Sequence, residues 1–197
     1  MEPLTSFLEI IISTLYLNLD QWDFTIFVLA LIIRVAFFPF QIFNFKQQEL
    51  LEKIQPEIDN ITAVLKHKPL ELHTMISNLK RKHGIKSGWS MIFSLIQLPV
   101  FFSIFKVFSS MQLLLNGRLA CVISLGSPDP LFILPALVAV IQFIQQKINT
   151  KAQPSFLKFM PLLSFLFMVA MPSGLVAYYL ASGVLQLMGD IILRRFT

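Results

Sequence analysis

Apolar stretches, each about as long as one bilayer crossing, dominate this sequence of 197 residues. A helix needs roughly 20 apolar residues to cross a hydrocarbon core about 30 Å thick. Residues 24–43 form the first such stretch, which only Arg34 and Gln41 interrupt. Hydrophobic residues make up 55% of the chain and charged residues 14%, whereas soluble domains have about 45–50% and about 25%. The sequence therefore predicts an all-α membrane protein.

The other apolar stretches bring the number of predicted transmembrane helices to five. These spans occupy residues 24–43, 88–111, 131–147, 156–171 and 174–193. The last two belong to one apolar run, which Pro172, Ser173 and Gly174 divide as turn residues do. Residues 112–130 are then an outer loop, and residues 148–155 are a cytoplasmic loop between spans three and four.

Basic residues are distributed unevenly between the two sides of these spans. Residues 44–87 hold eight of the sixteen Lys and Arg residues, and further ones precede span four and follow span five. Among the loops, only the outer loop carries a base on the opposite side, Arg118. Because cytoplasmic loops carry the excess of Lys and Arg, we predict an outer N-terminus and a cytoplasmic C-terminus.

Two segments outside the spans have apolar residues at helical spacing. Residues 1–23 contain an apolar run too short to cross a bilayer, so we predict an interfacial helix on the outer surface; a weakly ordered leader is the alternative. Residues 44–87 contain two such helical patterns, separated at His67, Lys68 and Pro69. They predict a cytoplasmic helical hairpin, and an ordinary connecting loop is the alternative.

Arg34 is the most informative single residue, because it lies near the middle of the first predicted span. An arginine at the centre of a span costs about 2.5–3.5 kcal/mol on insertion scales, and such charges usually face a bundle interior or water. The only acid within the spans is Asp190, near the cytoplasmic end of span five. We therefore predict a hydrated recess around Arg34. The alternative is a structural arginine bonded to backbone carbonyls or to Asp190.

Further polar side chains in the spans are candidates for the lining of the same recess. They are Gln97 in span two, Gln142 and Gln145 in span three, and Tyr179, Ser182, Gln186 and Asp190 in span five. Each alone is typical of helix packing, whereas together they favour a wet groove. The sequence offers no catalytic set, metal-ligand spacing or phosphate-binding loop, so we predict neither an enzyme nor a cofactor or metal site.

The order of several short motifs resembles the YidC/Oxa/Alb family of membrane protein insertases. These motifs are Leu31-Ile32-Ile33-Arg34, Gln55-Pro56, His83-Gly84, Gln97-Leu98-Pro99, Pro128-Asp129-Pro130, Gln145-Gln146-Lys147, Met160-Pro161 and Pro172-Ser173-Gly174. The resemblance covers residues 22–192. We expect neither a large outer domain before this region nor a basic ribosome-binding tail after it.

The resemblance implies five helices around a hydrophilic groove that opens to the cytoplasm and to lipid. In this family the arginine of the first core helix, here Arg34, contacts incoming substrates. Gln97 matches the family's glutamine in the second helix, and Tyr179 stands where a tryptophan is usual. The hairpin is expected to receive nascent membrane proteins, ribosomes, targeting factors or a Sec translocon, without direct contact to nucleic acid.

Three functions follow as hypotheses. The first is an insertase or chaperone that guides new membrane proteins into the bilayer of a bacterial inner membrane without nucleotide hydrolysis. The second is a small channel or transporter, in which Arg34 would be an anion site; the sequence shows no inverted repeats that would favour it. The third is an assembly factor that contacts folded clients and inserts nothing.

Overall fold

The computed structural model describes residues 2–86, 89–110, 117–119, 123–149 and 159–196, with residues 2, 89–98, 123, 149 and 196 described by their backbone only. Much of the two predicted loops, the beginning of the fourth predicted span and the side chain of Gln97 lie outside the described residues. The elements are α1 (Glu2–Leu19), α2 (Trp22–Val64), α3 (Pro69–Lys82), α4 (Trp89–Ser110), β1 (Arg118–Leu119), β2 (Ile123–Ser124), α6 (Ile133–Asn149), α7 (Met160–Val169) and α8 (Ser173–Phe196). An all-helical protein is thereby confirmed over the described residues, apart from one antiparallel strand pair that the sequence did not indicate.

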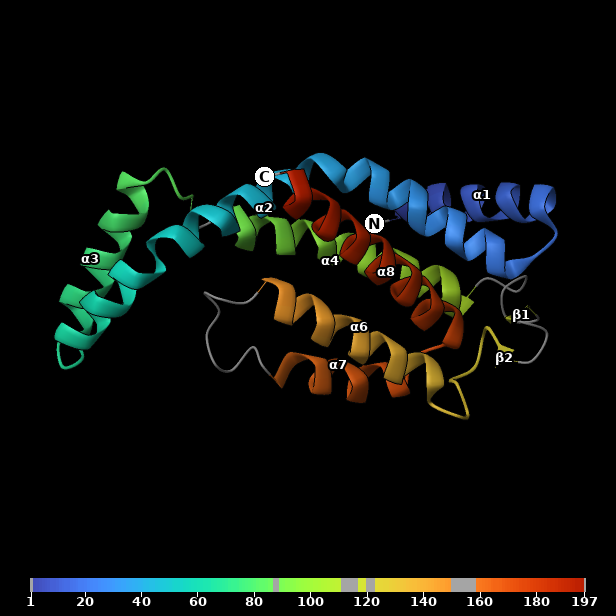
Figure 1. The fold of residues 1–197 in the computed structure, drawn as a ribbon. Helices are drawn as coiled ribbons and strands as arrows, with labels where there is room; N and C mark the ends of the chain where they lie inside the picture. The colour runs from blue at the N-terminus through green and yellow to red at the C-terminus, as the bar shows by residue number, and fades with distance from the viewer. Residues whose placement is uncertain (1, 87–88, 111–116, 120–122, 150–158, 197) are drawn as a thin grey trace.

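Helix α8 has the central position in the bundle. It packs against α2, α6 and α4, while α7 packs against α6 (Figure 1). Gly183 of α8 lies so close to α6 that an added Cβ would be 3.1 Å from Cγ2 of Ile141. Small residues allow helices in membranes to approach closely. A polar group on α8 can therefore meet partners on more than one neighbouring helix.

Helix α2 runs without interruption from the first predicted span into the predicted hairpin. It contains Pro39 and Pro56 and changes direction along its course (Figure 1), as helices do at prolines. The turn Leu65–Lys68 leads into α3, which returns along the distal part of α2. Pro69 begins α3, as proline commonly begins helices. These two arms project from one end of the bundle.

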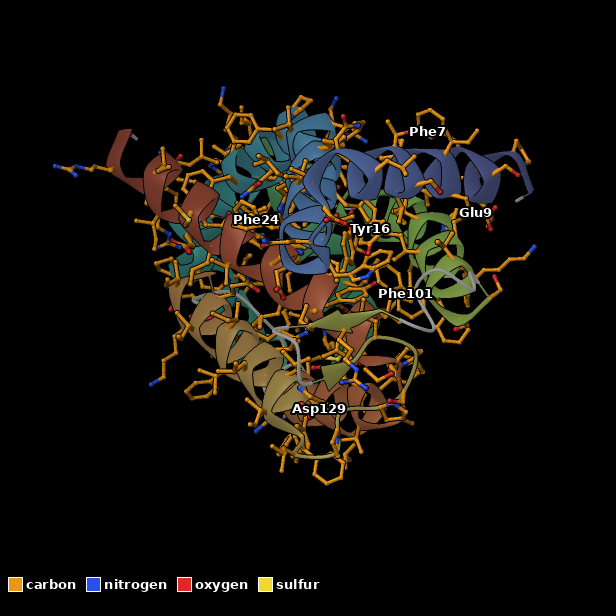
Figure 2. The ribbon with its side chains drawn as sticks, turned by 90° about the vertical axis from the view of Figure 1, so that its right-hand side faces the viewer. Phe7, Glu9, Tyr16, Phe24, Phe101 and Asp129 are labelled. Atoms are coloured by element: carbon orange, nitrogen blue, oxygen red, sulfur yellow. The ribbon has the colours of Figure 1, made fainter. Side chains whose placement is uncertain are left out.

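Helix α1 packs against both α2 and α4. It lies across the bundle in Figure 2, with Phe7 on its outer side. Its buried face includes Leu8 and Ile12, which are 4% and 1% exposed, whereas Leu17 is 83% exposed. The helix is therefore apolar on the face that other helices cover and also on the face that they leave open.

The end of the bundle opposite the hairpin is held by the strand pair and by the beginning of α8. The backbone N–H of Gly174 donates to the carbonyl of Leu125 at 3.0 Å, and that of Ser173 donates to Ser127 at 2.8 Å. A Cβ at position 174 would lie 2.6 Å from Cδ1 of Phe108. Glycine is required here because the start of α8 meets both a loop and an α4 side chain.

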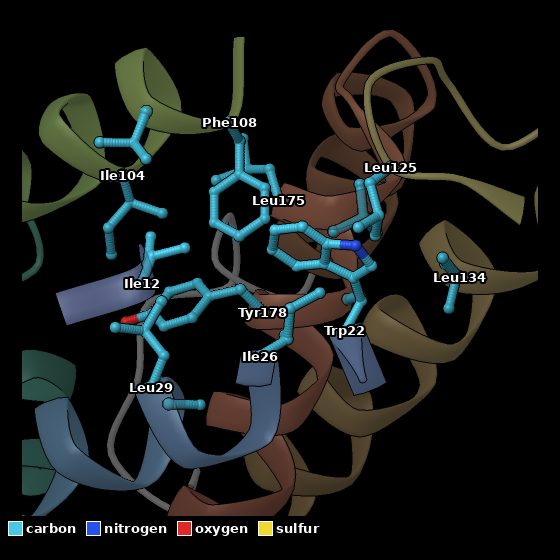
Figure 3. Close-up of a cluster of buried hydrophobic side chains, with 14 of the residues drawn as sticks. Ile12, Trp22, Ile26, Leu29, Ile104, Phe108, Leu125, Leu134, Leu175 and Tyr178 are labelled. Carbon is cyan, nitrogen blue, oxygen red and sulfur yellow. The ribbon is translucent and has the colours of Figure 1, made fainter. Parts of the chain in front are cut away.

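The hydrophobic core lies toward this end and draws on all the helices around α8. Figure 3 shows Trp22, Ile26 and Leu29 of α2 beside Phe108 of α4 and Tyr178 of α8. The ring of Trp22 stacks on that of Tyr16, with 4.1 Å between centroids. Core contacts therefore fix α1, α2, α4 and α8 relative to one another.

Large apolar side chains also cover the outside of the bundle. Two helices within the described residues, α2 and α8, are long and apolar enough to cross a bilayer, and their most apolar windows are only 22% and 28% buried. The core helix of a soluble protein would be mostly buried. Exposed apolar residues on the outer faces include Phe27, Leu31, Val35, Leu137, Val140, Phe143, Leu162, Leu166, Phe167, Met188 and Ile192. These faces suit lipid as their surroundings.

Asp129 holds the beginning of α6 and gives a prediction for stability. Its carboxylate is 2% exposed and accepts from the backbone N–H of Leu131 at 3.0 Å and of Leu134 at 2.8 Å. Loss of a side-chain cap costs about 0.5–2 kcal/mol, so Asp129→Ala should lower the free energy of unfolding by about that amount. Thermal unfolding in detergent measures the change. Asp129→Asn keeps only one of the two acceptor oxygens, so it should also lower the stability; an unchanged unfolding midpoint for Asp129→Ala would contradict the capping role.

Candidate functional site

The contact between α2 and α8 contains a row of polar side chains that begins at Arg34. On α8 the row consists of Ser182, Gln186 and Asp190, spaced four residues apart. Residues at this spacing lie on one face of a helix. On α2 the facing residues are Arg34 and Gln41, which are seven residues apart and therefore also share a face. We call these five residues the α2–α8 polar row.

Arg34 is half-buried and bonds to α8 through one nitrogen. Its Nη2 donates to Oε1 of Gln186 at 2.5 Å and to the backbone carbonyl of Ser182 at 3.3 Å. Its Nε is buried and has no hydrogen-bond partner among the residues that the structure describes. The bond to a backbone carbonyl matches the structural alternative given above for this arginine. Because this Nε is buried, a further acceptor reaches it only if the helices around Arg34 move apart.

Gln41 and Asp190 belong to the same row, although the sequence did not single out Gln41 for it. Nε2 of Gln41 donates to Oδ1 of Asp190 at 2.9 Å and to the carbonyl of Gln186 at 3.2 Å. Both side chains are buried, with 8% of Gln41 and 4% of Asp190 exposed. The helical spacing of Gln41 from Arg34 is the signal that could have identified it. Asp190 also interacts electrostatically with Arg34.

One turn beyond Asp190, the α2–α8 contact continues with an ion pair. Nη2 of Arg194 lies 3.4 Å from Oε1 of Glu52, and the guanidinium lies 6.0 Å from the ring centroid of Phe45. These residues line a cavity of about 240 Å³ together with Gln48 and Glu49. Positive and negative groups thus alternate along the contact, in the order Arg34, Asp190, Arg194 and Glu52.

The two predicted glutamines of α6 contact other helices. Nε2 of Gln145 donates to the carbonyl of Gly183 on α8 at 2.8 Å. Oε1 of Gln142 accepts from the hydroxyl of Ser164 on α7. Each bond joins two helices, as polar side chains do in membrane bundles. The structure therefore places these two glutamines outside the row around Arg34.

Tyr179, the remaining predicted residue of α8, has aromatic neighbours. Its ring centroid lies 5.7 Å from that of Phe101 on α4 and 5.6 Å from that of Tyr178. Phe101 also contacts Phe167 of α7 at 6.1 Å between centroids. Of the residues predicted for the recess, the structure therefore brings Arg34, Ser182, Gln186 and Asp190 together.

The chemistry available at the polar row is binding of an anionic or polar group. Arginine keeps its charge and offers donors in a planar fork that matches carboxylates. Within the part of the chain that the structure describes, no group of three or more His, Cys, Asp and Glu side chains could hold a metal ion. The row supplies one permanent cation, two amides, a hydroxyl and a carboxylate.

These features define a class of protein: a helical membrane protein in which a half-buried arginine forms part of a polar contact between two helices. Residues 14–197 match the family of the 60Kd inner membrane protein, and the chain belongs to this family. The family predicted from the sequence motifs is thus confirmed.

The curated relatives are longer proteins that carry the name membrane protein insertase YidC. The chain is 28% identical to the one from Wolinella succinogenes over 95% of its own length and 36% of the relative's. It is 26% identical to one from Helicobacter pylori (94% and 35%) and 28% identical to one from Polynucleobacter asymbioticus (85% and 31%). The chain therefore spans about a third of the length of these relatives.

Proposed function

We propose that this chain guides newly made membrane proteins into the lipid bilayer, as an insertase or chaperone that hydrolyses no nucleotide. The observation that carries the proposal is the polar row, in which a half-buried guanidinium lies in the contact between α2 and α8. Membership of a family of inner membrane proteins and the printed names of the relatives support it. The relatives' names also argue against a channel.

In the proposed mechanism, a client's acidic or polar segment enters from the cytoplasmic side and binds transiently at Arg34. The guanidinium compensates the client's charge, which lowers the cost of bringing that segment into the bilayer. The apolar helix of the client meanwhile moves sideways into lipid. Binding must be weak, because the segment has to leave on the outer side.

The proposed groove is lined by the seven residues expected from the sequence, namely Arg34, Gln97, Gln142, Gln145, Tyr179, Ser182 and Gln186. It lies among five spans with the boundaries given above. Support comes from the polar row for three of these residues. For Gln142 and Gln145 to line the groove, their bonds to α7 and α8 have to open when a client enters.

The proposed orientation puts the N-terminus outside and the C-terminus in the cytoplasm of a bacterial cell, with the protein in the inner membrane. Eight of the sixteen basic residues lie within residues 44–87, which supports this side for the hairpin. The hairpin would then be placed to receive nascent chains, and a ribosome, targeting factor or Sec translocon could contact it there.

Reconstitution tests the proposal directly. Liposomes containing only this protein should insert a small client with one short acidic tail, and the inserted tail should become protected from protease added outside the liposomes. Protein-free liposomes give the background. Flux of small anions without client insertion would support the channel. Liposomes that show neither anion flux nor client insertion would contradict the proposal.

A further inference from the structure

Asp190 is a buried carboxylate in a fixed position. It is 4% exposed, and Gln41 donates to it at 2.9 Å. Gln41 itself has little room to move, because a Cβ at Gly189 would lie 2.7 Å from its Nε2. The amide of Gln41 is also bonded to the carbonyl of Gln186. The position of the carboxylate is therefore set by α2 as well as by α8.

Gln186 connects this carboxylate to Arg34. Its side-chain oxygen accepts from Arg34 and its backbone carbonyl accepts from Gln41. Through Gln186 and Gln41, Arg34 and Asp190 thus belong to one chain of hydrogen-bonded groups. Because a buried charge is costly unless an opposite charge compensates it, each of the two stabilises the other inside the bundle.

We propose that Asp190 is the resident counter-charge of Arg34 and thereby sets the charge selectivity of the site. This inference rests on the proposed function. Asp190 already compensates part of the charge of Arg34, so the guanidinium attracts a client's carboxylate less strongly. Acidic clients are therefore bound weakly enough to be released. Gln41 is a positioning residue, because it holds the carboxylate on the α8 side of Arg34.

Asp190→Asn tests this role, since asparagine has nearly the same shape and can still accept from Gln41. Loss of the competing charge should raise the photo-crosslinking yield between an acidic client tail and a probe at Ser182 by about five- to tenfold. One nearby charge has an effect of about this size at an effective dielectric constant of about 20. A client whose tail acids are replaced by amides should crosslink equally well to the Asp190→Asn variant and to the unmodified protein.

Glu52→Gln is the matched control on the same helix contact. Glu52 is paired with Arg194 rather than with Arg34, so its replacement should leave the dependence on client charge unchanged. In an Arg34→Gln background only the direct repulsion between Asp190 and the client's acids remains, so Asp190→Asn should raise acidic crosslinking less than in the unmodified protein. An equal increase for acidic and neutral clients, or an equally large increase without Arg34, would overturn the inference.

A thermal unfolding cycle tests the same pair without any client. Asp190→Asn should lower the unfolding midpoint of the unmodified protein more than that of Arg34→Gln, because the two charges are coupled. Additive shifts would overturn the inference, whereas a failure of insertion by the unmodified protein would affect only the proposed function. If Asp190→Asn does not fold, Gln41→Met replaces it in the test. This variant should raise the crosslinking of acidic clients by a smaller factor. An unchanged crosslinking yield would contradict the inference.

Discussion

Replacing Arg34 with alanine is expected to slow insertion of clients with acidic translocated tails about tenfold or more. Hydrogen bonds to charged groups contribute about 1.5–3 kcal/mol, and about 1.4 kcal/mol corresponds to a factor of ten. The variant loses both the bond to Gln186 and the charge that attracts the client's carboxylate. Initial rates of tail protection in proteoliposomes measure the effect.

The controls for this prediction separate charge from folding. Clients whose tail acids are replaced by amides should be inserted at similar rates by both proteins. Arg34→Lys keeps the charge but loses the planar fork, so its rate should be intermediate. Lys106→Ala removes an exposed cation on α4 and should leave the rate unchanged. Equal slowing of acidic and neutral clients by Arg34→Ala would contradict the electrostatic role.

Of the substitutions considered, Trp22→Ala is expected to lower the free energy of unfolding most, by about 3–5 kcal/mol. Losses of this size are typical for large aromatic residues in packed cores. Trp22 is 7% exposed and stacks on Tyr16 of α1. A Cβ at Gly117 would lie 2.7 Å from its Nε1, so the backbone that leads into β1 also packs on this ring. The substitution would leave a cavity where α1, α2 and β1 meet. Unfolding midpoints in detergent measure the loss.

Phe24→Ala is the matched control for this stability prediction. Phe24 lies two residues further along α2 and is 57% exposed, so detergent or lipid can replace most of its contacts. Its removal should cost less than about 1 kcal/mol, as surface substitutions usually do. Equal losses at the two positions would show that the ring of Trp22 is not the centre of this contact.

Part of the polar row could be predicted from the sequence, because helical spacing places its members on one face. Ser182, Gln186 and Asp190 were recognised as a polar stripe on this basis, and Arg34 from its position within an apolar run. Their partners could not be predicted, since one helix does not reveal which face of another it meets. Gln41 was therefore missed, and Asp190 was named only as an alternative partner of Arg34.

The helix boundaries illustrate a similar limit. The apolar stretch 24–43 ends where the sequence becomes polar, but α2 continues to Val64, because a change from lipid to water does not end a helix. The apolar spacing in residues 1–23 indicated a helix with a face to cover. It could not indicate that α2 and α4 would cover part of this helix.

The most direct measurement is the access of water to the polar row in a lipid bilayer. With Cys121 replaced by serine, Ser182→Cys places a thiol beside Arg34, Met188→Cys places one on the outward face of α8, and Thr62→Cys places one on the hairpin. A charged, membrane-impermeant thiol reagent on the cytoplasmic side should modify position 182 within about tenfold of the rate at position 62, an allowance of about 1.4 kcal/mol. Modification as slow as at position 188 would contradict the account, because a dry contact between α2 and α8 could not receive a client's charge.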